Sequence, residues 1–153
     1  TNTNYDKTLH SGVEFNSKFR LCSWLSIMSN YAFTEAIFKN GEFKKKKIPG
    51  IPVHKWTAGL DLNLPKHLYF YLGANYTGER YFLSDQKNEF PRLGAYATVD
   101  MKLSYKIDDY TLYTAVNNFF DENYSEYGVI YSDKKHYYPS RGRNFVIGGS
   151  VKF

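Results

Sequence analysis

Cysteine pairs, catalytic motifs and long apolar runs are what this sequence of 153 residues lacks. Its single cysteine, Cys22, can form neither an internal disulfide nor a cysteine-based zinc site. No stretch approaches the roughly 20 consecutive apolar residues that a membrane-spanning helix needs, which excludes that class. The four histidines are far apart, and neither an HExxH pattern nor a glycine-rich phosphate loop occurs. We therefore expect no enzyme activity, no metal site and no cofactor.

The net charge, the length and the first residues narrow the possible classes of protein further. Lys and Arg number 20 against 15 Asp and Glu, which gives a net charge of +5. This excess is mild and is spread along the chain, so we expect no nucleic-acid binding. The length suits one domain. The first residues, Thr1-Asn2-Thr3-Asn4, include neither a methionine nor a signal peptide, which predicts a processed or excised piece.

Alternation with a period of two is the clearest pattern that is present. From Trp56 to Leu64 every second residue is apolar, and the intervening residues are polar or glycine. A β-strand sends successive side chains to opposite faces, so this segment has one apolar and one polar face. The same pattern predicts seven strands, near residues 13–19, 25–34, 54–64, 68–76, 96–107, 110–120 and 145–153.

The connections between these strands alternate between short and long. The short ones fall at residues 20–23, 65–67 and 108–109, and the long ones at 40–52, 82–94 and 121–142. Tight turns at one end and long loops at the other are typical of an outer-membrane barrel, which also leaves no open edge in lipid. The sequence therefore predicts an all-β, antiparallel transmembrane β-barrel wall. Its lipid-facing residues would include Trp56, Leu60, Leu62, Val99, Met101, Leu103, Ile147 and Val151.

Two further expectations follow from this wall, and two alternatives to it stay open. Bacterial single-chain barrels have an even number of strands, so an odd count of seven predicts the C-terminal part of a larger barrel. Aromatic residues would form belts at both rims, with Trp24, Tyr110 and Phe153 near the tight turns and Tyr31, Phe33, Tyr76 and Phe145 nearer the loops. The alternation alone also fits a passive porin, or a small soluble barrel of lipocalin type whose apolar face points inward.

Five stretches in a fixed order resemble motifs of the TonB-dependent outer-membrane receptors. They are Ile48–His54, Ala74–Tyr81, Tyr96–Asp100, Val116–Tyr124 and Tyr138–Phe145. The fourth is similar to the "NNLFD..Y" signature with Phe119 for leucine, and the fifth to "YPxPGR" with Arg141 for the second proline. The terminal Phe153 is similar to the C-terminal aromatic that the barrel-assembly machinery recognises.

This resemblance implies a receptor with a 22-stranded barrel and a plugged lumen. Its ligand would be a scarce nutrient such as a ferric siderophore, haem or cobalamin, and transport would be energised through TonB. The family's plug domain and TonB box are absent from this chain, so residues 1–153 would be the C-terminal portion of the barrel. The partners implied are the plug and remaining strands of the parent chain, TonB, the barrel-assembly machinery, outer-membrane lipid and lipopolysaccharide.

The predicted outer loops carry the candidate binding residues. Rigid aromatic rings and cations suit a flat, anionic metal chelate, although tyrosines can also simply hold a loop against the rim. The ligand-binding candidates are Arg80, Tyr81, Arg92, Tyr124, Tyr127, Tyr131, Lys134 and His136. The run Lys44, Lys45, Lys46 and Lys47 is either a solvated loop, a contact for lipopolysaccharide phosphates or a means of steering an anionic chelate.

Overall fold

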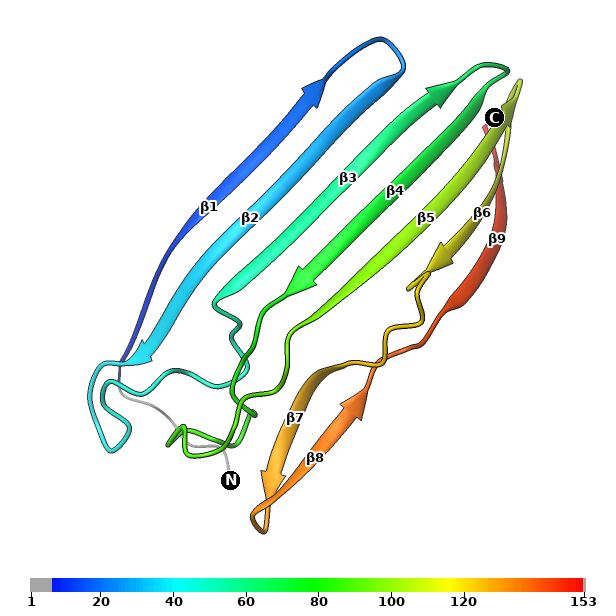
Figure 1. Ribbon diagram of the computed structural model, residues 1–153. Coiled ribbons are helices and arrows are strands. Elements are labelled where there is room, and N and C mark those ends of the chain that lie inside the picture. The colour runs from blue at the N-terminus through cyan, green and yellow to red at the C-terminus, as the bar shows by residue number, and fades with distance from the viewer. Residues whose placement is uncertain (1–6, 153) are drawn as a thin grey trace.

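The computed structural model describes residues 7–152, which contain nine β-strands (Figure 1). The strands are β1 Thr8–Arg20, β2 Leu25–Phe38, β3 His54–Leu64, β4 Leu68–Thr77, β5 Tyr96–Ile107, β6 Tyr110–Asn117, β7 Ser125–Tyr131, β8 Lys134–Pro139 and β9 Asn144–Val151. Seven form one antiparallel sheet in the order β1-β2-β3-β4-β5-β6-β9, and β7 and β8 form a separate two-stranded sheet. Within residues 7–152 there is no helix that is long and apolar enough to cross a membrane.

The seven strands of this sheet confirm the predicted wall. Short turns join the strands at one end, and the long connections gather at the other (Figure 1). Lys66, His67 and Asp108 have φ values of 62°, 59° and 50° in the two tightest turns. These left-handed residues let the chain reverse within three residues in one turn and within two in the other.

The β7–β8 hairpin differs from the prediction, in which residues 121–142 form one loop. Ser132 and Asp133 form its two-residue turn with φ values of 48° and 58°. Both values are positive, as a type I′ hairpin turn requires. The hairpin extends beyond the sheet at the loop end, so the longest loop is an ordered element rather than an irregular one (Figure 1).

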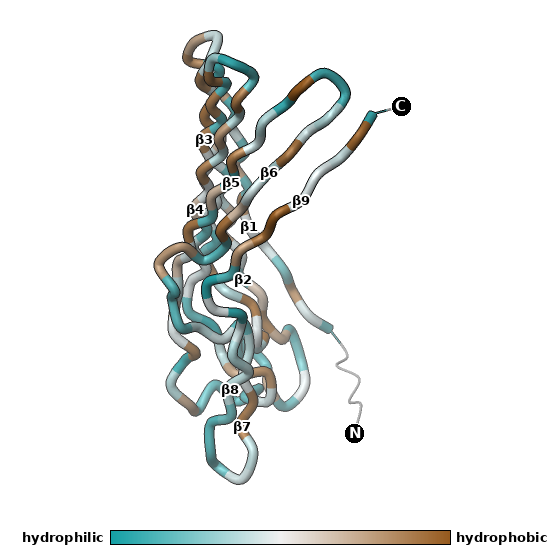
Figure 2. Tube along the Cα trace, turned by 90° about the vertical axis from the view of Figure 1, so that its right-hand side faces the viewer, coloured by the Kyte–Doolittle hydropathy of each residue, from teal (hydrophilic) through white to brown (hydrophobic). Residues whose placement is uncertain are grey.

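The cross-strand register shows which residues of neighbouring strands share a face of the sheet. Paired residues of neighbouring strands point to the same face, so a row of partners shows what that face presents. One row on the apolar face contains Ile27, Leu60, Leu72, Met101, Val116 and Phe145. One row on the polar face contains Arg20, Ser26, Asp61, Tyr71 and Lys102. Figure 2 shows the resulting alternation of hydropathy along the strands.

All eight predicted lipid-facing residues lie on the apolar face by this register. Contact with lipid itself stays a prediction. The face is not enclosed: Val13, Phe145 and Ile147 are 67%, 72% and 86% exposed. The buried apolar residues of the described part are Ala36, Phe38, Phe82 and Leu93, at or beyond the loop end of the sheet. This arrangement does not favour the lipocalin-type alternative, which would need the apolar residues in a closed interior.

Candidate functional site

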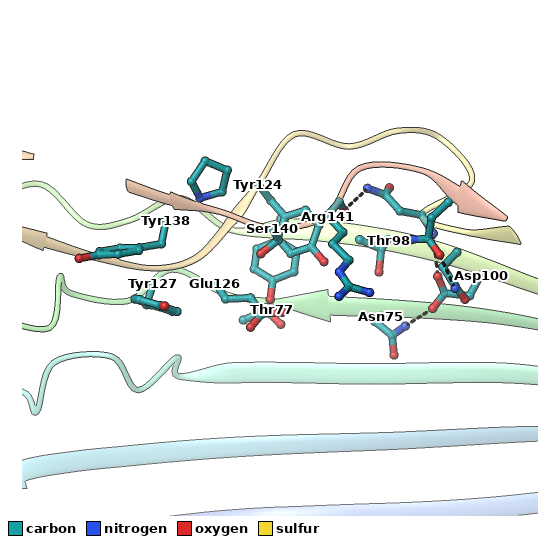
Figure 3. Close-up of a pocket in the computed structure, with 15 residues that line it drawn as sticks. Asn75, Thr77, Thr98, Asp100, Tyr124, Glu126, Tyr127, Tyr138, Ser140 and Arg141 are labelled. Carbon is teal, nitrogen blue, oxygen red and sulfur yellow. Dashed lines mark hydrogen bonds between the residues drawn. The ribbon is translucent and has the colours of Figure 1, made fainter. Parts of the chain in front are cut away.

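A hollow of about 760 Å³ lies at the loop end of the sheet, on its polar face (Figure 3). The ends of β4, β5, β6 and β9 form its floor, and the chain around β7 and β8 forms its wall. The floor residues are Asn75, Thr77, Tyr96, Thr98, Asp100, Asn117, Asn118 and Asn144. The wall residues are Tyr124, Glu126, Tyr127, Tyr138, Pro139, Ser140 and Arg141.

Hydrogen bonds between neighbouring strands fix the floor. The amide of Asn75 donates to Oδ2 of Asp100 at 3.1 Å, and the backbone N–H of Asn118 donates to Oδ1 at 2.8 Å. Both carboxylate oxygens therefore have a donor, which offsets the cost of half-burying the charge. Asn117 and Asn144 bond to each other across β6 and β9 at 2.8 Å. The floor thus offers ordered amide and hydroxyl groups.

Two stacked tyrosine pairs form the aromatic part of the hollow. The ring centroids of Tyr96 and Tyr124 lie 4.1 Å apart, and those of Tyr127 and Tyr138 lie 4.7 Å apart. Burial raises the pKa of the Tyr124 hydroxyl, and the nearby Tyr96 and Glu126 raise it further. Tyr124 is therefore a neutral hydrogen-bonding group at physiological pH.

Hydrogen bonds after β6 account for the polar residues of the Asn-Asn-Phe-Phe-Asp motif. Asn118 is 3% exposed and has a φ of 51°, which asparagine tolerates better than most residues. Its side chain donates to the carbonyl of Glu122 and accepts from the N–H of Glu122, both at 2.9 Å. Asp121 accepts from the N–H of Arg143 at 2.7 Å. The Asn118 bonds fix the start of the longest loop, and the Asp121–Arg143 bond joins its two ends.

Arg80, a predicted ligand-binding residue, is only 3% exposed and lies beneath the start of β7. Its guanidinium donates to the carbonyls of Gly78, Ser125 and Glu126. It also lies 5.3 Å from the centroid of the Tyr96 ring. Burial lowers the pKa of this group, and Tyr96 and Glu126 oppose that change. Ligand contact by Arg80 stays a prediction, and in this structure its donors face main-chain oxygens.

The other predicted binding residues lie in three places. Tyr124 and Tyr127 line the hollow, whereas Tyr131, Lys134 and His136 lie in the outer part of the hairpin and do not. Tyr131 is 72% exposed there. In the β4–β5 connection, Cζ of Arg92 lies 5.2 Å from the centroid of the Tyr81 ring. Nη1 of Arg92 also lies 3.4 Å from Oε2 of Glu79. The spacing of these residues in the sequence does not show that they lie in different places.

The lysine run lies in the β2–β3 connection. Lys44, Lys45 and Lys46 are exposed, and Nζ of Lys47 lies 3.7 Å from Oε1 of Glu35. The Lys47 backbone also accepts from and donates to the Asn88 side chain, at 3.0 and 2.7 Å, which joins two long connections. Contact with lipopolysaccharide stays a prediction. The predicted assembly signal Phe153 lies outside the described residues.

The floor residues are not among the predicted ligand-binding residues. Asn75, Thr98, Asp100, Asn117 and Asn144 are polar-face residues at or near the loop ends of their strands. The alternation could have selected them, once combined with the direction of each strand. Arg141 had no such signal, because its position depends on the fold of the hairpin. Its side chain extends from the segment after β8 toward the β4 side of the floor (Figure 3).

Comparison with known proteins decides the family. Residues 1–119 match the family model described as "TonB dependent receptor-like, beta-barrel". The chain belongs to this family. Its members are transport receptors of the bacterial outer membrane rather than enzymes, and the seven-stranded sheet is barrel wall.

Individual relatives agree with this assignment. The chain is 26% identical to the iron-regulated outer membrane virulence protein of Vibrio cholerae, over 98% of its own length. It spans only about a fifth (22%) of that relative. The solved structure of the ferric yersiniabactin uptake receptor FyuA from Yersinia pestis matches 95% of this chain with a TM-score of 0.83, at 24% identity and over 24% of FyuA. The ferric citrate transporter FecA matches with the same identity and shares and a TM-score of 0.80, so these two structures show the shared fold.

Proposed function

We propose that this chain is the C-terminal part of a complete TonB-dependent receptor that takes up a ferric siderophore. The observation that carries the proposal is the hollow on the polar face, formed where tyrosine-rich loop segments meet the strand ends. In a closed barrel the polar face lines the lumen, so the hollow would open on the path of a ligand from the cell surface.

The need for further strands follows from the edges of the sheet. β1 and β9 each have only one neighbour among the described residues. Unpaired backbone donors and acceptors are very unfavourable in hydrocarbon, so further strands must pair with both edges. Seven strands are also too few to enclose a plugged lumen, because barrel diameter grows with strand number. The plug and the remaining strands of the parent chain would complete the receptor, and the plug would connect it to TonB.

The proposed ligand class rests on the chemistry around the hollow. The Tyr127 and Tyr138 rings can stack on a flat aromatic chelate, and Arg141 can pair with its negative charge. The exposed Tyr131, Lys134 and His136 would make the first contacts at the surface. FyuA is a ferric yersiniabactin uptake receptor and FecA a ferric citrate transporter, which supports an iron chelate here by analogy.

Two further partners belong to the same proposal. The exposed Lys44, Lys45 and Lys46 would contact lipopolysaccharide phosphates, since cations near an anionic membrane surface are attracted to it. Phe153 would be recognised by the barrel-assembly machinery during insertion. Neither contact is needed for ligand binding, so each can be tested separately.

An uptake assay tests the function. The complete receptor is expressed in a bacterium that lacks its own ferric-siderophore receptors, and radioactive iron uptake is measured from ferric catecholate, hydroxamate and citrate chelates, with haemin and cobalamin for comparison. We expect uptake of at least one ferric chelate, and its loss when TonB is deleted. Uptake that persists without TonB would instead support a passive porin, and uptake of haemin or cobalamin alone would refute the siderophore assignment.

A substitution connects uptake with the hollow. Tyr127→Ala together with Tyr138→Ala removes one stacked pair, and we expect the chelate to bind about tenfold more weakly, since aromatic stacking contributes about 0.5–1.5 kcal/mol per pair. Tyr110→Ala is the matched control, because this tyrosine lies on the apolar face near the tight turns. Binding is measured by quenching of intrinsic fluorescence. Equal losses in both proteins would contradict a specific role for the hollow.

A further inference from the structure

We propose that Arg80 is a positioning residue: its guanidinium holds the base of the β7–β8 hairpin so that Tyr124 and Tyr127 line the hollow. The proposal rests on the proposed function insofar as it concerns ligand binding. The mechanical part, that Arg80 fixes the hairpin, stands on the contacts of Arg80 alone.

The contacts of Arg80 reach two parts of the chain. Its backbone N–H and carbonyl bond to Leu93 at 3.2 and 2.8 Å, which anchors the residue inside the β4–β5 connection. Its side chain then crosses to β7, where Nε donates to the carbonyl of Glu126 at 2.8 Å and Nη2 to that of Ser125 at 2.6 Å. These residues are 45 and 46 positions away in the sequence.

The backbone of β7 explains why a side-chain donor is needed there. The pairing of β7 with β8 has a register shift between Ser125 and Tyr127, and Glu126 has no partner on β8. A β-bulge of this kind leaves a backbone group outside the ladder and redirects nearby side chains. Arg80 supplies the donor for the Glu126 carbonyl. Glu126 and Tyr127, although adjacent in sequence, both line the hollow.

The chemistry of arginine suits this position. A guanidinium has five N–H donors in a planar fork, whereas a lysine ammonium is a compact point charge. Arg80 uses the fork to reach Gly78, Ser125 and Glu126. No ion pair of Arg80 occurs in the part of the chain that the structure describes. The group is therefore buried on main-chain carbonyls and on the face of Tyr96, which itself stacks on Tyr124.

A second set of contacts holds the outer half of the hairpin. The Leu83 N–H bonds to the Gly128 carbonyl at 2.9 Å, and the Ser84 hydroxyl bonds to both backbone groups of Ile130 at 2.7 and 2.9 Å. Loss of Arg80 alone would therefore loosen the base of the hairpin without detaching all of it. The base is the part that includes the hollow-lining residues, so ligand binding would respond although the barrel still forms.

Spin labelling measures the mechanical part. The complete receptor, with Cys22→Ser and a nitroxide at Asn123→Cys, an exposed residue next to Tyr124 at the base of the hairpin, is compared with its Arg80→Gln and Arg80→Lys variants in outer-membrane vesicles. Heat-modifiable gel mobility first establishes that each barrel has assembled. We expect a more mobile label in both Arg80 variants. Arg92→Gln is the matched control for mobility, because this arginine lies in the same connection but contacts Glu79 and Tyr81 rather than the hairpin.

Chelate binding measures the functional part on unlabelled receptors, with the ferric chelate that the wild-type protein takes up. We expect both Arg80 variants to bind about tenfold more weakly, because two tyrosine side chains must be ordered during binding instead of beforehand. Unchanged label mobility overturns the proposal, and so does a mobile hairpin with unchanged affinity. Full affinity in Arg80→Lys alone would mean that charge, not position, matters. A wild-type receptor that binds no chelate refutes the proposed function, and label mobility then decides by itself whether Arg80 fixes the hairpin.

Discussion

At the scale of single residues, asparagine and aspartate side chains join strands to loops through hydrogen bonds. Asp100 illustrates this, because its two carboxylate oxygens accept from Asn75 on β4 and from Asn118 after β6. A half-buried charged group is tolerable there because each of its oxygens accepts a hydrogen bond. The residue therefore orders three neighbouring segments rather than acting as an isolated charge.

Asn118 gives a prediction at this scale. Replacing it with alanine removes the side-chain bonds to Glu122 and strains a backbone with a φ of 51°. Replacing it with glycine removes the same bonds without the strain. We expect Asn118→Ala to lower the free energy of unfolding by about 2–4 kcal/mol and Asn118→Gly by about 1 kcal/mol less than that. Urea-dependent loss of heat-modifiable mobility measures both, and a glycine variant that is no more stable than the alanine variant would contradict the backbone argument.

At the scale of elements, the β7–β8 hairpin is held by close contact as well as by hydrogen bonds. Phe82 is 1% exposed, and its ring lies against Gly128 of β7. A Cβ added to Gly128 would lie 2.8 Å from the Phe82 ring and from the His136 carbonyl. The glycine is thus needed for a close approach between the β4–β5 connection and the hairpin.

The corresponding prediction uses two glycines of the loop region. Gly128→Ala should displace the hairpin and expose the peptide bonds after Lys134 and Lys135 to trypsin, about tenfold faster than in the wild type if docking contributes about 1.4 kcal/mol. Gly94→Ala is the control, because no atom of residues 7–152, apart from its chain neighbours, lies within 4 Å of the added Cβ. Cleavage is followed on gels with intact cells. Equal cleavage rates in the two variants would show that the contact with Phe82 does not hold the hairpin.

At the scale of the whole molecule, the sheet separates two environments. Its apolar face is largely exposed in the isolated chain, and its polar face carries the hollow. A soluble protein would bury the first of these faces, whereas an outer-membrane barrel covers it with lipid. The long connections all lie at one end, so the binding features and the tight turns are at opposite rims (Figure 1).

Neighbouring residues of β5 test this division. Leu103 lies on the apolar face and Ser104 on the polar face. Leu103→Arg should destabilise the inserted barrel by about 2–4 kcal/mol, because a charge would face hydrocarbon, while Ser104→Arg should have a much smaller effect. The same contrast is expected between Leu60→Arg and Asn63→Arg on β3. The fraction of heat-modifiable receptor in outer membranes is the measurement, and equal losses on both faces would refute the assigned orientation.

The sequence predicted the sheet better than it predicted the site. Alternation between apolar and polar residues depends only on near neighbours, so the seven strands of the sheet were predicted in the right order. Their bounds were less accurate, since the strand predicted at residues 110–120 ends at Asn117 and the first strand begins at Thr8. The hairpin was missed because β7 and β8 are short and do not alternate between apolar and polar residues, and β8 is exposed along its whole length. In the site, Tyr124 and Tyr127 were selected by residue type, but the floor residues required knowledge of where each strand ends.

What the sequence determined by itself is which side chains share a face, because that follows from the two-residue period of an extended backbone. What only the tertiary structure decided is which distant residues meet. Arg80 lies 45 positions before Ser125, and Asp100 lies 18 positions before Asn118. No local pattern encodes such partners, since they depend on how loops fold back over strand ends and on which buried polar groups still need a hydrogen bond.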